Sequence, residues 1–164
     1  MFGTIVWATD GSELADETLP LVTELAGIHG SKIVAVHVNE LFRGGRFGGG
    51  PLFADENELQ EKIAAQVNDM REAGFDAELD VVTSRRHDTE GLIIAEAATT
   101  AGADLIVIGT HGRSVTAAMF LGSVTTGLAH VAPCPVPAVP PRSQRAPGAQ
   151  TSRHRWASVS PAHE

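Results

Sequence analysis

Short apolar runs alternate with helical stretches along the first 140 residues, and this order constrains the fold more than any other feature. Five runs have the length and β-branched content of strands: 4–9, 32–38, 76–84, 104–109 and 134–139. Four stretches between them carry apolar residues at helical spacing: 10–30, 56–74, 87–102 and 123–132. Such alternation predicts an α/β fold, with a five-stranded parallel sheet in the Rossmann-like order 3-2-1-4-5 and helices on both faces.

The individual segments refine this arrangement. The run 104–109 is apolar throughout and predicts a central strand, whereas 76–84 alternates and suits an edge position. Pro20 falls inside the first helical stretch, where we expect it to kink the helix. The glycine-dense stretch 39–56 predicts a long loop between the second strand and the second helix.

Composition bounds the class of protein. We expect one domain over residues 1–141 and a disordered basic tail over 142–164, which shows no periodicity. A net charge of −8 argues against nucleic acid as a partner, because phosphate binding requires a basic face. The single cysteine excludes a disulfide framework. The sequence shows neither a signal-peptide pattern nor an apolar run long enough to span a membrane, so a cytoplasmic protein is expected.

The predicted topology indicates where a ligand would bind. Doubly wound sheets bind ligands beyond the carboxyl ends of their strands, at the point where the winding direction reverses. In this strand order that point lies between the first and fourth strands. The residues that follow these two strands are Thr9, Asp10 and Gly11 on one side and Gly109, Thr110, His111 and Gly112 on the other.

The segment 109–124, GTHGRSVTAAMFLGSV, combines glycines with the start of a helix. Glycine lets backbone N–H groups approach an anion closely. A helix that begins at Gly122 and Ser123 presents further free N–H groups to the same anion. These features fit a phosphate cradle, to which Arg113 would add charge, but spacing alone fits a simple turn and a capped helix equally well. Neither a Walker A motif nor a GxGxxG dinucleotide fingerprint occurs in the sequence.

Five motifs, in their order along the chain, resemble the universal stress protein family. They are ATDGS after the first strand, VHV in the second, DLIVIGTHGRS, LGSVT and HVAPCPV. The spacing Gly109-x-x-Gly112-x₉-Gly122-Ser123 is similar to the signature of the branch of this family that binds ATP. The resemblance covers about residues 2–139 and implies a nucleotide site at the predicted crevice.

Carried over position by position, the resemblance implies contacts to both halves of ATP. Asp10 would meet the ribose or the adenine, with Ala8 and Thr9 beside it, and Val38 would contact the adenine partly through its backbone. Ile108 and Gly109 would line the nucleotide, and Gly112 would approach the phosphates. The phosphates would be bound by backbone N–H and hydroxyl groups of Gly122, Ser123, Val124 and Thr125. A divalent ion, Mg²⁺, would be held largely by the phosphates.

Other polar residues suggest less. His111 either reaches a phosphate or faces solvent, and His37, inside the second strand, reads as a packed core histidine. Asp10 could also be an ordinary helix N-cap. The acidic residues of 55–61 are typical of a helix start with an exposed face. No nucleophile–base pair and no metal-ligand spacing is recognisable, so we assign no catalytic residue and expect at most slow ATP hydrolysis.

The last predicted strand bears on assembly. The resemblance implies a homodimer through this strand, in the region from Val136 to Val139. Pro135 and Pro137 point their backbone groups to the same side of the strand and lack N–H donors. The missing donors therefore weaken either the contact with the twin strand or the pairing with the fourth strand.

The function expected from these observations is that of an ATP-binding universal stress protein that regulates stress responses or metabolism through nucleotide-dependent interactions. One alternative is a protein that binds cyclic AMP or another adenine nucleotide. A second is an enzyme of the same architecture that hydrolyses ATP or transfers adenylyl groups. A third is a chaperone-like interaction module without nucleotide.

Overall fold

A computed structural model describes residues 1–42, 50–51, 55–84, 90–112 and 121–144. Its strands are β1 (Thr4–Ala8), β2 (Lys32–Phe42), β3 (Gly50–Pro51), β4 (Ala77–Ser84), β5 (Leu105–Gly109) and β6 (Ala138–Val139). Its helices are α1 (Glu13–Asp16), α2 (Leu19–His29), α3 (Glu56–Glu72), α4 (Glu90–Ala101), α5 (Ser123–Val131) and the 3-10 turn η1 (Arg142–Gln144).

The sheet confirms the predicted topology. Five parallel strands lie in the order β4-β2-β1-β5-β6, which is the expected order 3-2-1-4-5. β5 is buried at every position, as its apolar sequence predicts, whereas only the first and last residues of β4, at the edge of the sheet, are buried. β3 adds a short antiparallel pairing to the far end of β2, so part of the glycine-dense segment is a strand and not a loop.

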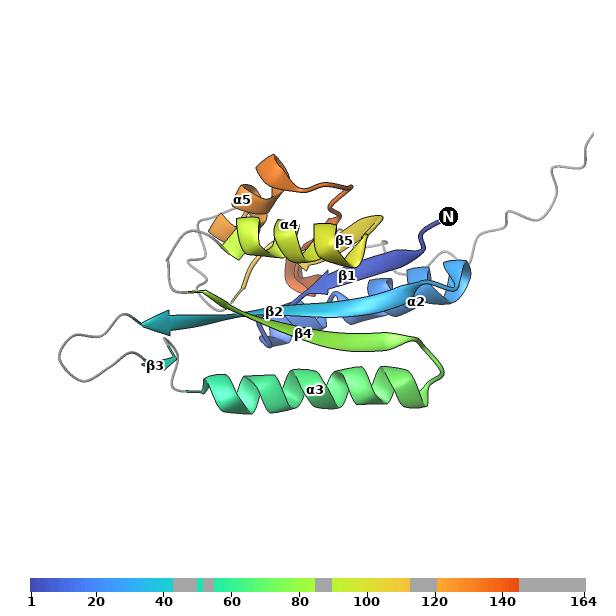
Figure 1. The fold of residues 1–164 in the computed structure, drawn as a ribbon, viewed down its shortest axis with the longest axis horizontal. Helices are drawn as coiled ribbons and strands as arrows, with labels where there is room; N and C mark the ends of the chain where they lie inside the picture. The colour runs from blue at the N-terminus through green and yellow to red at the C-terminus, as the bar shows by residue number, and fades with distance from the viewer. Residues whose placement is uncertain (43–49, 52–54, 85–89, 113–120, 145–164) are drawn as a thin grey trace, which may run out of the picture.

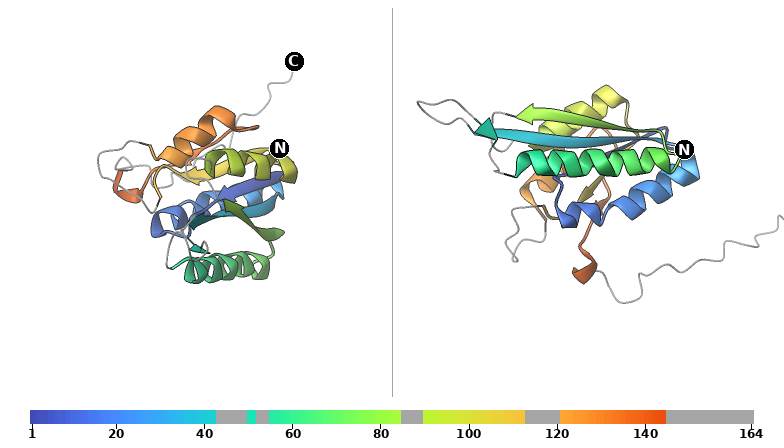
Figure 2. Two further views of the ribbon diagram at one scale, coloured as in Figure 1. Left: turned by 60° about the vertical axis from the view of Figure 1, so that its left-hand side comes forward. Right: turned by 90° about the horizontal axis from the view of Figure 1, so that it is seen from below.

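Helices cover both faces of the sheet and enclose two cores (Figures 1 and 2). Strand side chains alternate between the faces, so neighbouring residues such as Val6 and Trp7 belong to different cores. One core packs against α2 and α3: Ile5, Trp7, Val22, Ala26, Ile33, Ala35, Ile63, Val67, Met70, Ala77, Leu105 and Val107. The other packs against α4 and α5: Val6, Ala8, Val34, Val36, Ile94, Ala95, Ala98, Ile106, Ile108 and Leu128.

The first helical stretch differs from its prediction because it consists of two helices. α1 begins after Ser12, whose hydroxyl accepts from Ala15 N, and ends at Asp16. α2 follows with Pro20 in its first turn, where a missing N–H costs no helical hydrogen bond. The expected kink at Pro20 is therefore wrong, since the chain breaks before the proline.

The last strand is shorter than predicted, and its prolines face the sheet. The carbonyls of Pro135 and Pro137 accept hydrogen bonds from Ile106 N (3.0 Å) and Ile108 N (3.3 Å) of β5. Neither proline can donate in return, so the regular pairing is confined to Ala138 and Val139. The missing donors thus weaken the pairing with β5 and leave the outer side of this segment unaffected.

The described residues bear on two further expectations, the disordered tail and the lack of a membrane-spanning segment. At the start of the predicted tail, Arg142 N donates to the Glu17 carboxylate (2.5 Å), and η1 follows there, whereas 145–164 lie outside the described residues. Within the residues that the structure describes, no helix is both long and apolar enough to cross a bilayer.

Candidate functional site

The carboxyl end of β1 places Thr9 and Asp10 at the predicted crevice. Pairing with β2 ends at Ala8, after which Thr9 N donates to Val36 O (3.0 Å). Asp10 then turns the chain, because its Oδ1 accepts from Ser12 N (3.0 Å) and Ser12 Oγ (2.6 Å). Ser12, and not Asp10, caps α1. The ordinary N-cap alternative for Asp10 is therefore excluded.

Val38 lies beside this turn on the neighbouring strand. Backbone groups of Val36 and Val38 point to the same side of β2 because strand residues alternate. Val36 O reaches Thr9, so the backbone of Val38 points past the end of β1. β2 continues to Phe42 and therefore extends beyond the end of β1 at this side of the site.

The end of β5 meets the turn that carries Asp10. A Cβ atom on Gly112 would lie 2.5 Å from Asp10 Oδ2, so any other residue here would displace the Asp10 carboxylate from its present position. Ile108, which is 7% exposed, pairs with Ala8 of β1. Gly109 is buried, and a Cβ atom there would lie 3.0 Å from the His111 carbonyl. The structure therefore brings together the two segments that the sequence predicted to meet.

The amino end of α5 lies next to the residues that follow β5. Gly122 N donates to Thr110 O (2.7 Å), and Gly122 precedes the helix as its N-cap without a side chain to cap it. The first N–H groups of a helix have no partner within it. Those of Ser123, Val124 and Thr125 are consequently the donors that α5 presents at its amino end. Ser123 is exposed at this position.

Two side chains near the amino end of α5 already form hydrogen bonds within the protein. The Thr125 hydroxyl donates to Gly109 O (2.9 Å) and is buried, so its proton already serves to join α5 to β5. His111 is only 8% exposed, and its Nδ1 lies 2.8 Å from Thr110 Oγ1. The expectation of a solvent-facing His111 is wrong. Arg113, the expected extra positive charge, lies outside the described residues.

A buried polar pair below the site escaped the sequence analysis. His37 is fully buried, as predicted for a core histidine, and its Nδ1 donates to Thr9 O (3.0 Å). Its Nε2 lies 2.6 Å from Oε1 of Glu56, which is 1% exposed. The interpretation of the acidic residues of 55–61 as an exposed face is therefore wrong for Glu56. Helical spacing offered a usable signal, because Glu56 lies three residues before Leu59 and therefore on the same face of the helix as the apolar stripe.

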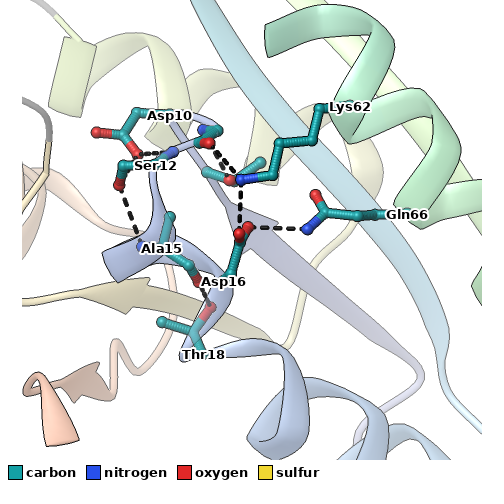
Figure 3. A network of polar contacts seen from close by, with 9 residues as sticks. Asp10, Ser12, Ala15, Asp16, Thr18, Lys62 and Gln66 are labelled. Carbon is teal, nitrogen blue, oxygen red and sulfur yellow. Dashed lines mark hydrogen bonds and ion pairs between the residues drawn. The ribbon is translucent and has the colours of Figure 1, made fainter.

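Lys62 is a second residue that the sequence did not single out. Its Nζ donates to Gly11 O (2.8 Å) and to Asp16 Oδ2 (2.6 Å) (Figure 3). Gln66, one turn further along α3, donates to Asp16 Oδ1 (2.8 Å). The position of Lys62 between Leu59 and Ile63 of the apolar stripe was a usable signal, because it places the lysine at the border of the buried face.

Metal and thiol chemistry find little support among the described residues. The part of the chain that the structure describes holds no group of three or more His, Cys, Asp or Glu side chains placed to bind a metal ion. Cys134 is half-buried, and burial raises the pKa of its thiol, with Asp104 adding to the shift. A raised pKa disfavours the reactive thiolate, in agreement with a structural role.

These features describe a doubly wound α/β protein in which glycines and a helix amino end meet beyond β1 and β5. The universal stress protein family model matches residues 1–140. A universal stress protein of Thermus aquaticus is 33% identical over 140 residues, which cover 83% of this chain and 97% of the relative. The chain therefore belongs to the universal stress protein family.

Two solved structures have the same fold. A universal stress protein of Archaeoglobus fulgidus in complex with dAMP is 24% identical, with a TM-score of 0.59 over 87% of this chain and 98% of that one. A universal stress protein in complex with cAMP is 22% identical, with a TM-score of 0.59 over 84% of this chain and 96% of that one. These likenesses support the architecture.

Proposed function

We propose that this protein binds ATP in the crevice between β1 and β5 and uses the bound nucleotide to regulate its interactions. One observation carries the proposal. Asp10, Gly112 and the amino end of α5 converge on one place. Gly112 passes so close to Asp10 that an added Cβ atom would lie 2.5 Å from Oδ2, and Gly122 N donates to Thr110 O (2.7 Å). A carboxylate, a glycine-walled passage and free helical N–H groups suit a nucleoside joined to phosphates.

The phosphates belong at the amino end of α5. The N–H groups of Ser123, Val124 and Thr125 and the positive end of the helix dipole would stabilise them. The Ser123 hydroxyl is exposed and would donate as well, whereas the Thr125 hydroxyl is committed to Gly109. The N–H group of Gly122 already donates to Thr110 O and is not available to a phosphate. Gly122 would instead help because it has no side chain to block the approach of a phosphate to the helix start. His111 would reach the nucleotide only through its edge that faces away from Thr110.

The adenosine belongs at the ends of β1 and β2. Asp10 would accept a hydrogen bond from the ribose or the adenine, with Ala8, Thr9 and Ile108 as the floor. Val38 would offer its backbone to the adenine, since that backbone points past the end of β1. Two relatives of the same fold were solved with adenine nucleotides, cAMP and dAMP, which supports an adenine-binding role here.

A Mg²⁺ ion fits this proposal only as a partner of the phosphates. The described residues provide no side-chain cluster for an ion of their own, so the ion would neutralise phosphate charge and not be anchored by the protein. We assign no general base, because the ring of His111, beside the helix start, is 8% exposed and engaged with Thr110 Oγ1 through Nδ1 (2.8 Å). We therefore propose a nucleotide sensor with at most slow hydrolysis.

Mass spectrometry of small molecules released on denaturing the purified protein tests this function. ATP should be released, or should bind on titration more tightly than cAMP, because the cradle at α5 favours a chain of phosphates. Release of cAMP, or tighter binding of cAMP, would favour the second candidate, for which the cAMP-bound relative is the specific support. Absence of adenine nucleotide by both methods would leave a chaperone-like interaction module.

A homodimer through the last strand is part of this proposal. The carbonyls of residues 135, 137 and 139 face β5, so by alternation Cys134, Val136 and Ala138 point their backbone groups outward. None of these three is a proline, and each retains its N–H donor. The outer edge can therefore pair with a second copy, and a monomer by analytical ultracentrifugation at micromolar concentration would refute this.

A further inference from the structure

α3 is linked to the chain on both sides of Asp10, through His37 of β2 before it and directly through Lys62 after it. The carbonyl of Thr9, just before it, accepts from His37 Nδ1 (3.0 Å), and His37 Nε2 in turn contacts Glu56 Oε1 of α3 (2.6 Å). The carbonyl of Gly11, just after it, accepts from Lys62 Nζ of α3 (2.8 Å). Both peptide carbonyls that flank the ligand-facing aspartate are thus held by groups that α3 anchors.

The contact before Asp10 is deeply buried. The side chains of His37 and Glu56 are each 1% exposed, so water does not compete for their hydrogen bond. A carbonyl oxygen only accepts, so the proton of the bond to Thr9 resides on Nδ1. Gln60 Nε2 donates to the same Glu56 oxygen (2.9 Å) and fixes the carboxyl group on its helix. The result is a continuous hydrogen-bonded link from α3 to the end of β1.

The contact after Asp10 is a cation with two acceptors from different elements. Lys62 Nζ binds Gly11 O and Asp16 Oδ2 of α1 (2.6 Å) at the same time (Figure 3). Gln66 Nε2 holds the other oxygen of Asp16 (2.8 Å). Lys62 and Gln66 lie one turn apart on α3 and therefore face the same way. Together they fasten the turn and α1 to a single helix.

The backbone of the turn between the Thr9 and Gly11 carbonyls also packs against α3. Gly11 has a φ of +73°, which glycine adopts without strain, and a Cβ atom there would lie 2.9 Å from Leu59 Cδ2. The turn therefore packs closely against the Leu59 side chain of α3. Asp10 itself has its Oδ1 fixed by Ser12, so its carboxylate moves with this turn.

We propose that α3 is the positioning element of the nucleoside half of the site, with Lys62 and the His37–Glu56 pair as its positioning residues. They hold Asp10 in the place where it meets the ribose or adenine, without touching the ligand. This inference rests on the proposed function, since it assigns the structural support for adenine-nucleotide binding. It concerns the nucleoside and not the phosphates, because α5 carries the phosphate side.

The test substitutes Lys62→Met and compares it with Lys32→Met. Lys32 forms an equivalent ion pair with Glu78 (2.8 Å), its side chain is 38% exposed like that of Lys62, and it lies at the amino end of β2, opposite the site. Isothermal titration with adenosine, AMP and ATP should show about tenfold weaker binding for Lys62→Met, by the same factor for all three ligands. Lys32→Met should bind all three as the wild type does, and Lys62→Arg should restore most of the affinity.

A double-substitution cycle distinguishes positioning from a general structural role. If Lys62 acts through Asp10, Lys62→Met should have little further effect on affinity in an Asp10→Asn background. An undiminished effect in that background, or equal affinities of Lys62→Met and Lys32→Met, would overturn the inference. Circular dichroism and melting temperatures confirm that each variant folds, and Lys62→Gln serves if the methionine variant does not. A wild type that binds no adenosine, AMP or ATP would overturn the proposed function as well, so the two failures are distinguishable.

Discussion

The two halves of the candidate site are built from different parts of the chain. Around Asp10, side chains shape the site, because Ser12, His37 and Lys62 fix the turn through hydrogen bonds to its carboxylate and carbonyls. Around α5, the backbone shapes the site, because Gly112 and Gly122 allow close approach and the helix start provides N–H groups. α3 supports the first half through Lys62. The residues at the end of β5 support the second half, because Thr110 O accepts from Gly122 N and Gly109 O accepts from the Thr125 hydroxyl.

The two kinds of construction should respond differently to substitution. Where backbone groups bind the ligand, affinity should fall when a larger side chain is introduced and should change little when a side-chain group is removed. A site made of side-chain hydrogen bonds is sensitive to the loss of a charge, even one carried by a residue that does not touch the ligand. Ligands with different numbers of phosphates separate the two halves, because only the second half should discriminate among them.

The largest effect is expected for Gly122→Val. A Cβ atom at this position would lie 3.2 Å from Thr110 O and 4.0 Å from Thr125 Oγ1, so the added branches would crowd the helix start. We expect ATP to bind at least about 100-fold more weakly, through loss of charge-assisted hydrogen bonds of about 1.5–3 kcal/mol each. Titration calorimetry would measure it, with circular dichroism as the check of folding. Unchanged ATP affinity would show that the phosphates lie elsewhere.

A smaller effect, with a different ligand pattern, is expected for Asp10→Asn. The amide retains the size of the carboxylate but lacks its charge, so the hydrogen bond to the nucleoside weakens by about 1.5–2 kcal/mol, or roughly 10- to 30-fold. If Asp10 contacts the nucleoside, as we propose, adenosine and ATP should lose affinity by the same factor in titration calorimetry. A loss confined to ATP would place Asp10 at the phosphates and contradict the division of the site into two halves.

No effect on nucleotide affinity is expected at the opposite end of the sheet, where Asp104→Asn serves as the probe. Asp104 accepts from Gly3 N (2.6 Å) and Thr4 N (3.2 Å), and these backbone bonds lower its pKa. Because its pKa is lower in the folded protein, the ionised Asp104 carboxylate stabilises the fold at pH values above its unfolded pKa of about 3.9. This stabilisation is lost as the pH falls through the pKa of the folded state. The variant should therefore melt below the wild type at pH 7, and the difference should shrink below about pH 4. Melting curves at both pH values would measure it, and a loss of ATP affinity would contradict the assignment of the site to one end.

The sheet could be predicted from the sequence because the information that specifies it is local. Each strand and helix is marked by its own apolar spacing, and the alternation of the two types restricts the connections to parallel crossovers. The same reasoning predicted that the residues after β1 and β5 lie together, because the positions of the strand ends follow from the order of the strands. It also placed Asp10 opposite Gly112, where a Cβ atom would lie 2.5 Å from the Asp10 carboxylate. Pro20 and the last strand were harder, because the effect of a proline depends on whether it lies in the first turn of a helix and on which side of a strand faces its neighbour.

The support beneath Asp10, in contrast, depends on tertiary packing. Glu56 and Lys62 look like ordinary charges at a helix start and on a helix surface, and their partners lie 19 and 51 residues away in the chain. Helical spacing places both residues on or beside the buried face of α3, but the groups that they meet there depend on how the helix packs against the sheet. The order of the strands and the meeting of the ends of β1 and β5 therefore follow from the sequence alone. The way α3 fixes the crevice follows from packing, since the His37–Glu56 bond and the Lys62 contacts exist only once the helix has docked.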